Sequence, residues 1–139
     1  KGVGKTSIAQ IIYNQSPLVA AFVYAPVLAD NLFATLKQDS EKDLVTLTKE
    51  YADVPLLIID DLGTEHTGGN GFMAARFTQL IDMRYSRHKV AGDRPTMITT
   101  NLSQELLTAK YAEGRLADRI FERGFSKRIA INTPSWRTG

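Results

Sequence analysis

The sequence predicts an α/β domain in which a parallel β-sheet carries helices on both of its faces. Strand-like runs at residues 18–24, 55–59 and 95–100, of which the first two are nearly continuously apolar, alternate with segments whose apolar residues recur at helical spacing. Acidic residues follow the second run, an asparagine follows the third, and a stretch rich in glycine opens the chain. Because ligands bind at the carboxyl ends of parallel strands, these polar residues are expected to meet at one edge of the sheet.

The opening stretch, KGVGKT at residues 1–6, is typical of the second half of a phosphate-binding loop. Gly2 and Gly4 lack a Cβ, so successive backbone N–H groups can turn toward a polyphosphate. Lys5 can reach the β- and γ-phosphates, the Thr6 hydroxyl can ligate Mg²⁺, and the helix that follows adds its positive end. The residues expected to bind ATP or ADP are Gly2, Val3, Gly4, Lys5, Thr6 and Ser7. The full motif needs a further glycine upstream of Lys1, so a plain turn before a helix is the alternative interpretation.

The first part of the chain after this loop predicts two strands and three helices. Helices are expected at residues 6–15, 28–36 and 40–51, and strands at 18–24 and 55–59. The first helix places Ile8, Ile11 and Ile12 on one face, and Ser40 with Asp43 resembles a capping box for the third.

The second part predicts a long helix from residue 73 that frays near His88, then a strand at 95–100. Ser103 is a suitable N-cap for a helix over 104–111. A further helix over 115–122 leads to a last strand around 126–131.

Composition indicates a soluble globular protein of one domain, residues 1–139, with 43% hydrophobic and 23% charged residues. There is no apolar run of membrane-spanning length, no signal peptide and no cysteine, so a cytoplasmic location without membrane partners is expected. Residues 1–83 hold 6 Lys and Arg against 10 Asp and Glu, whereas residues 84–139 hold 11 against 5. The basic second part could face nucleic acid, nucleotide phosphates or an acidic neighbour, or be a merely solvated surface.

Two acids and an amide are the candidate catalytic groups. Asp60 is expected near a magnesium ion, which it would hold through water, and Asp61 can polarise the attacking water. Asn101 could orient that water or touch the γ-phosphate, although a capping asparagine is the ordinary alternative. Glu65 could assist as a base, but a solvated side chain is the preferred interpretation. For the acid pair, the alternative is an acidic turn after a core strand.

Three arginines recur every fourth residue, at Arg115, Arg119 and Arg123, and therefore lie on one helix face. Asp118 and Glu122 on the same helix could neutralise them in a salt-bridged surface. The other hypothesis is an arginine that reaches the phosphate bound by a neighbouring subunit.

The order of the motifs resembles the AAA+ ATPase core of bacterial and phage helicase loaders of the DnaC/DnaI type. The resemblance rests on KGVGKTS, LLIIDDLGTE, PTMITTNLSQEL, GRLADRIFER and PSWR, which cover nearly the whole chain. It implies a Walker A motif at Gly4, Lys5 and Thr6, and a Walker B motif at Asp60 and Asp61. It further implies a sensor-1 asparagine at Asn101, an arginine finger at Arg119 and a sensor-2 arginine at Arg137.

The chain departs from that pattern at three points. Many AAA+ proteins have Glu in the position of Asp61, and the shorter Asp is expected to make hydrolysis slow. The first Walker strand is expected to be absent from the chain, and the segment between Thr6 and residue 18 is short for the group. We therefore expect part of a longer protein, with little or no helical lid.

The resemblance implies an ATPase that loads a replicative DnaB-type helicase onto single-stranded DNA during replication initiation and self-associates through its ATP sites. An IstB-type transposition helper resembles the same core, although NLSQEL and GRLADRI favour the loader. A third hypothesis is a nucleotide-gated adaptor with negligible hydrolysis.

Overall fold

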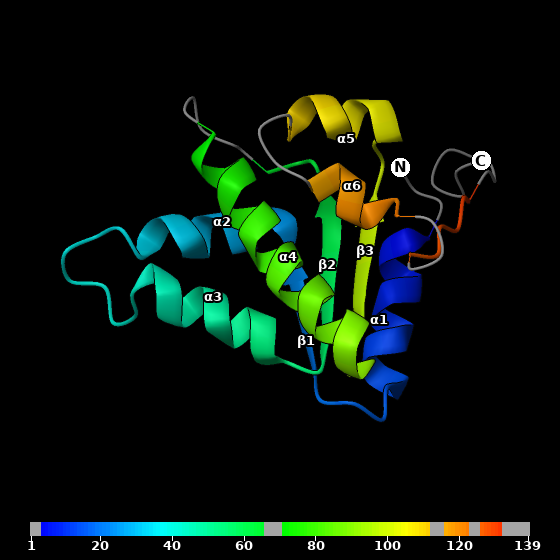
Figure 1. Ribbon diagram of the computed structural model, residues 1–139, viewed down its shortest axis with the longest axis horizontal. Helices are drawn as coiled ribbons and strands as arrows, with labels where there is room; N and C mark the ends of the chain where they lie inside the picture. Colours follow the sequence, from blue (N-terminus) through cyan, green and yellow to red (C-terminus); the bar gives the residue numbers. More distant parts are fainter. Residues whose placement is uncertain (1–3, 66–70, 112–115, 123–125, 132–139) are drawn as a thin grey trace.

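A parallel three-stranded sheet forms the centre of the computed structural model, which describes residues 4–65, 71–111, 116–122 and 126–131 (Figure 1). The strand order is β1-β2-β3, and both strand pairs are parallel. The elements follow in the order α1 (Lys5–Gln15), β1 (Ala20–Tyr24), α2 (Ala25–Ala34), α3 (Leu44–Asp53), β2 (Leu56–Leu62), α4 (Phe72–Ala91), β3 (Thr96–Thr100), α5 (Gln104–Lys110) and α6 (Leu116–Ile120). The predicted alternation of strands and helices is confirmed.

Helices cover both faces of the sheet, and the side chains of β2 alternate between them (Figure 1). Leu57 and Ile59 belong to the larger apolar core, which they form with residues of α2, α3 and α4. Leu56 and Ile58 belong to a smaller cluster with Ala9 of α1. A strand covered on both faces must be apolar at every position, which explains the unbroken run LLII.

Helix α1 rests on the sheet through a small residue rather than through its isoleucines. Ala9 is fully buried, whereas Ile8, Ile11 and Ile12 are 43%, 54% and 39% exposed. The described residues therefore leave the predicted isoleucine face of this helix largely uncovered.

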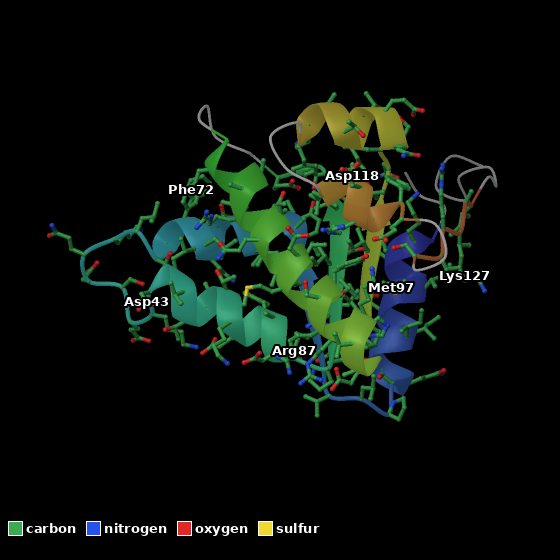
Figure 2. The ribbon with its side chains drawn as sticks, viewed as in Figure 1. Asp43, Phe72, Arg87, Met97, Asp118 and Lys127 are labelled. Carbon is green, nitrogen blue, oxygen red and sulfur yellow. The ribbon has the colours of Figure 1, made fainter. Side chains whose placement is uncertain are left out.

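The N-cap of α3 and the end of α4 differ from those predicted. Asp43, at the start of α3 in Figure 2, is the cap, and its carboxylate accepts a hydrogen bond from the Thr46 amide. The Ser40 hydroxyl instead donates to the Lys42 carbonyl. Helix α4 does not end near His88. It continues to Ala91, where Gly92 adopts φ 68° and donates its amide to the His88 carbonyl at 2.7 Å. No helix in the described ranges has the length and apolarity to cross a bilayer.

The predicted last strand, at residues 126–131, is not a strand. A strand needs a partner edge for its N–H and C=O groups, and this segment pairs with none of β1, β2 and β3. Helix α6 is also shorter than predicted, and Arg115 and Arg123 lie outside the described residues, so a shared arginine face is not described.

One fully buried arginine of α4 connects the end of α3 with the residues that precede β2 and β3 and with the start of β3. Arg84 of α4 donates through Nη1 to the carbonyls of Tyr51, Ala52 and Val54, at 2.9, 3.1 and 2.6 Å. Its other nitrogens donate to the carbonyls of Pro55 and Pro95 and to the Thr96 hydroxyl. The last carbonyls of a helix lack partners within that helix, so this guanidinium caps α3. Burial lowers the pKa of Arg84 to about 10, which leaves it protonated at neutral pH.

Candidate nucleotide-binding site

The first turn of α1 begins at a glycine whose conformation the motif requires. Gly4 is the N-cap and adopts φ 87°, in the left-handed region that side chains other than glycine rarely adopt. Its carbonyl accepts the first helical hydrogen bond, from the Ile8 amide at 2.9 Å. Lys5 is half-buried and Ser7 is exposed in this turn, while Gly2 and Val3 lie outside the described residues.

The structure brings Thr6 and Asp60 into direct contact, although 54 residues separate them in the chain. The Thr6 hydroxyl donates to Asp60 at 2.9 Å from Oδ2 and 3.2 Å from Oδ1. Asp60 is only 4% exposed, and Thr99 of β3 donates a second hydroxyl to its Oδ1 at 2.6 Å. A buried carboxylate is stable only when it is hydrogen-bonded, and these two threonines satisfy it.

The second acid lies at an irregularity of β2. The pairing of β2 with β3 shifts between Ile59 and Leu62, and Asp61 adopts φ 60°, the one positive value among the described residues other than glycine. The Asp61 amide donates to the Thr99 hydroxyl at 2.8 Å, and its Oδ1 accepts from Asn101 Nδ2 at 3.2 Å. Successive residues of a regular strand point to opposite faces, so this bulge changes the direction of Asp61 relative to Asp60.

Thr99 is the residue of this cluster that the sequence interpretation missed. Its hydroxyl contacts the side chain of Asp60 and the backbone of Asp61 at once. Its position two residues before Asn101 could have indicated it, because alternate residues of a strand share a face.

The interpretation of Glu65 as a solvated side chain is wrong. Its side chain is buried, with 2% exposure, and both carboxyl oxygens accept hydrogen bonds. The Gly63 amide donates to Oε2 at 2.8 Å, and the hydroxyl of Tyr111 donates to Oε1.

The Thr6 and Asp60 oxygens suit a small hard cation such as Mg²⁺, which prefers oxygen ligands and keeps several waters. The described residues contain no group of three His, Cys, Asp or Glu that could hold a metal by themselves. An ion bound here would therefore take further oxygens from water and phosphate, which is the usual arrangement for magnesium in nucleotide sites.

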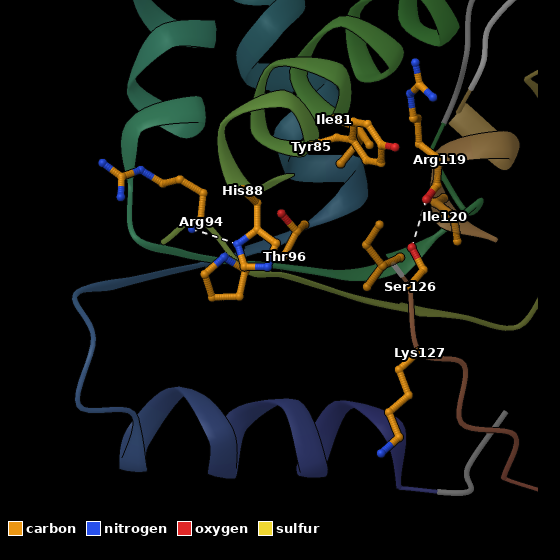
Figure 3. Close-up of a pocket in the computed structure, with 11 residues that line it drawn as sticks. Ile81, Tyr85, His88, Arg94, Thr96, Arg119, Ile120, Ser126 and Lys127 are labelled. Atoms are coloured by element: carbon orange, nitrogen blue, oxygen red, sulfur yellow. Dashed lines mark hydrogen bonds between the residues drawn. The ribbon is translucent and has the colours of Figure 1, made fainter. Parts of the chain in front are cut away.

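Arg119 makes its contacts with α4 rather than with this cluster. Its Nε donates to Asp82 at 2.8 Å, its guanidinium lies 4.4 Å from the ring centroid of Tyr85, and Glu122 approaches it at 3.9 Å. The hydrogen bond to Asp82 raises the pKa of Arg119. Arg119 and Tyr85 both line a cavity of about 290 Å³ that also borders β3 (Figure 3). Arg137 lies outside the described residues.

Known structures share this fold. The crystal structure of DnaI aligns with a TM-score of 0.67 and 25% identity over 96% of this chain and 67% of that one. The crystal structure of the DnaC helicase loader aligns with a TM-score of 0.68 and 23% identity over 94% and 73%. The chain thus has the P-loop fold of AAA+ type that the sequence predicted.

A sequence relative comes from insertion sequence IS232 of Bacillus thuringiensis subsp. berliner and is named for ATP binding. It is 31% identical over 122 residues, which are 88% of this chain and 46% of the relative, so the chain spans about half of that protein. No protein-family model matches the chain. In fold and sequence the chain is similar to the IstB/DnaC-like group of AAA+ domains, as its motifs implied.

Proposed function

We propose that the chain is an ATP-binding and ATP-hydrolysing AAA+ domain that loads a replicative DnaB-type helicase onto single-stranded DNA. The observation that carries the nucleotide site is the hydrogen bond between Thr6 and Asp60. It joins the start of α1, where the helix dipole favours anions, to the carboxyl end of β2, where ligands of parallel sheets bind.

Each residue of the motif then has a distinct role in binding. The backbone amides of Gly2, Val3, Gly4 and Ser7 surround the phosphates, and Lys5 neutralises the β- and γ-phosphates. Thr6 and Asp60 hold Mg²⁺, which would offset the negative charge of the phosphates when bound.

Hydrolysis is assigned to the pair at the bulge. Asp61 polarises the attacking water, and Asn101 orients the Asp61 carboxylate through its amide. Because Asp61 is shorter than the glutamate of many AAA+ proteins, turnover is expected to be slow. Arg119 completes the site of a neighbouring subunit, and Arg137 senses the nucleotide from the C-terminal segment.

Single-stranded DNA is the proposed nucleic-acid ligand because of the basic balance after residue 83. Helix α3 and the segment just before it offer little unpaired positive charge to DNA, because two of their lysines form ion pairs. Lys42 pairs with Glu50, and Lys49 pairs with Asp53. These contacts favour a structural role for this helix and direct the search for DNA contacts to the second part of the chain.

A second candidate is a transposition helper, and the similarity to the IS232 protein favours it. Both candidates share the ATP site and differ in the partner. A third candidate is the adaptor with negligible hydrolysis, which differs from the first candidate in the rate of ATP turnover.

We expect ATP turnover to rise when single-stranded DNA is added, and a DnaB-type helicase to be retained on that DNA only with protein and ATP. The affinity for single-stranded DNA should fall as the salt concentration rises. The logarithm of the association constant, plotted against the logarithm of the salt concentration, should have a slope of about −0.7 for each phosphate contact. Turnover assays, salt titrations and DNA pull-downs measure these quantities. Retention of a transposase in place of the helicase would support the second candidate. Tight ATP binding without turnover would support the adaptor.

A further inference from the structure

Residues 63–65 are held by a hydrogen-bonded group that consists of Glu65, Lys110 and Tyr111 and that we call the loop clasp. Lys110 Nζ donates to the carbonyls of Gly63 and Glu65, at 2.7 and 3.0 Å. Tyr111 is 1% exposed and donates its hydroxyl to Glu65, whose other oxygen accepts from the Gly63 amide. The clasp therefore links both the N–H and the carbonyl of Gly63 to the end of α5.

Gly63 has no room for a side chain in this conformation. It adopts φ 102°, and a Cβ at this position would lie 2.4 Å from Leu102 Cδ1. A side chain here would meet both an unfavourable backbone conformation and a steric clash. Position 63 therefore requires glycine, and the Gly63 carbonyl is held from α5 by Lys110.

The clasp holds Gly63, which lies two residues beyond Asp61 and its positive φ. A residue other than glycine keeps a positive φ only where its surroundings hold it there. Two threonine side chains provide that support: the Thr64 hydroxyl donates to the Asp61 carbonyl at 2.8 Å, and the Thr100 hydroxyl donates to the Leu62 carbonyl at 2.7 Å. The clasp anchors the backbone of Gly63 and Glu65 next to this segment, so its loss would let Asp61 relax.

We propose that Glu65, Lys110 and Tyr111 are positioning residues, which keep the Asp61 carboxylate in the geometry needed for ATP hydrolysis. The proposal rests on the ATPase activity proposed above. It assigns to Glu65 a hydrogen-bonding role and not that of a base, because both of its oxygens are occupied inside the protein. Small displacements of a reacting group lower turnover strongly while they leave binding unchanged.

The test compares Tyr111→Phe, Glu65→Gln and Glu65→Ala in kcat, KM for ATP and thermal unfolding. Tyr111→Phe should lower kcat about 10- to 100-fold with KM within about twofold. Glu65→Gln should keep turnover within about threefold, since its amide can accept from Gly63 and donate to Tyr111. Glu65→Ala should lose at least as much as Tyr111→Phe. Tyr51→Phe is the matched control, because the Tyr51 hydroxyl accepts a hydrogen bond from Asn31 of α2, which is not part of the clasp.

Two outcomes in the turnover assay would overturn the proposal. Parental kcat in Tyr111→Phe would show that the clasp does not position Asp61. Equal loss in Glu65→Gln and Glu65→Ala, with ATP affinity retained, would show that Glu65 acts through its charge as a base.

Hydrogen exchange at the Gly63 amide separates this proposal from the proposed function. Exchange should be faster in Tyr111→Phe than in the parent and in Tyr51→Phe, whether or not ATP is hydrolysed. A parent that binds ATP without turnover would contradict the ATPase activity, and faster exchange would still support the clasp. Unchanged exchange would overturn the clasp.

Discussion

Replacement of Arg84 with methionine should lower the free energy of unfolding by about 3–5 kcal/mol. Methionine fills similar space but donates no hydrogen bond, so it leaves the carbonyls at the end of α3 without their partner. Pro95 and Thr96, at the start of β3, lose the same donor group. Urea denaturation measures this loss of unfolding free energy. The slope m of the free energy against urea concentration is compared between the variants.

Arg87→Met is the matched control, one turn further along α4. Arg87 makes an exposed ion pair with Asp53, so its loss should cost less than about 1 kcal/mol. Arg84→Lys should fall between the two, because an ammonium cannot reach carbonyls on both sides as a planar guanidinium does. Equal losses for Arg84→Met and Arg87→Met would show that the buried contacts do not stabilise the domain.

Arg119→Ala should lower ATP turnover about 10³-fold while ATP affinity stays within about threefold. An arginine finger stabilises charge that develops on the transferred phosphoryl group, so its loss affects turnover far more than binding. Within its own chain Arg119 is held by Asp82 and Tyr85, and it must leave Asp82 to reach a neighbour. Turnover and titration of a labelled ATP analogue measure the two effects.

The substitution Asp82→Asn distinguishes two roles for Arg119, an arginine finger and a structural salt bridge. If Arg119 acts on a neighbouring subunit, loss of the Asp82 charge should leave turnover at or above the parental value. If the salt bridge is structural, both substitutions should destabilise the protein and lower turnover together.

A mixture of Arg119→Ala and Lys5→Ala should regain activity, because some interfaces then combine an intact loop with an intact finger. No recovery would contradict action in trans.

The strands were predictable because their signals are local. The predicted runs placed β1, β2 and β3 within two residues of their observed ends, apart from the carboxyl end of β2, which lies three residues further on. Ser103 caps α5 as expected by accepting a hydrogen bond from the Leu106 amide. The KGVGKT and DD stretches likewise identified residues that the fold brings together, as Thr6 and Asp60 show.

The remaining features depend on contacts between distant residues. The extension of β2 through both acids accompanies a bulge and the Thr99 hydroxyl, which is 38 residues from Asp61. The contact between Glu65 and Tyr111 spans 46 residues, and the partners of Arg84 lie on α3, on β3 and in the segments just before β2 and β3. Charge and periodicity alone do not reveal such pairings, which is why Arg84 was counted only as part of a basic region and Glu65 was expected in solvent.

Titration of a labelled ATP analogue with Mg²⁺ into the parent and Lys5→Ala tests most directly whether the cluster at the strand ends is a nucleotide site. Lys5 supplies the charge expected beside the β- and γ-phosphates, so its removal should weaken binding about 100-fold. Lys37→Ala, in the turn after α2, is the control for the loss of one positive charge and should bind like the parent. Equal affinity of the parent and Lys5→Ala would contradict the assignment of the site.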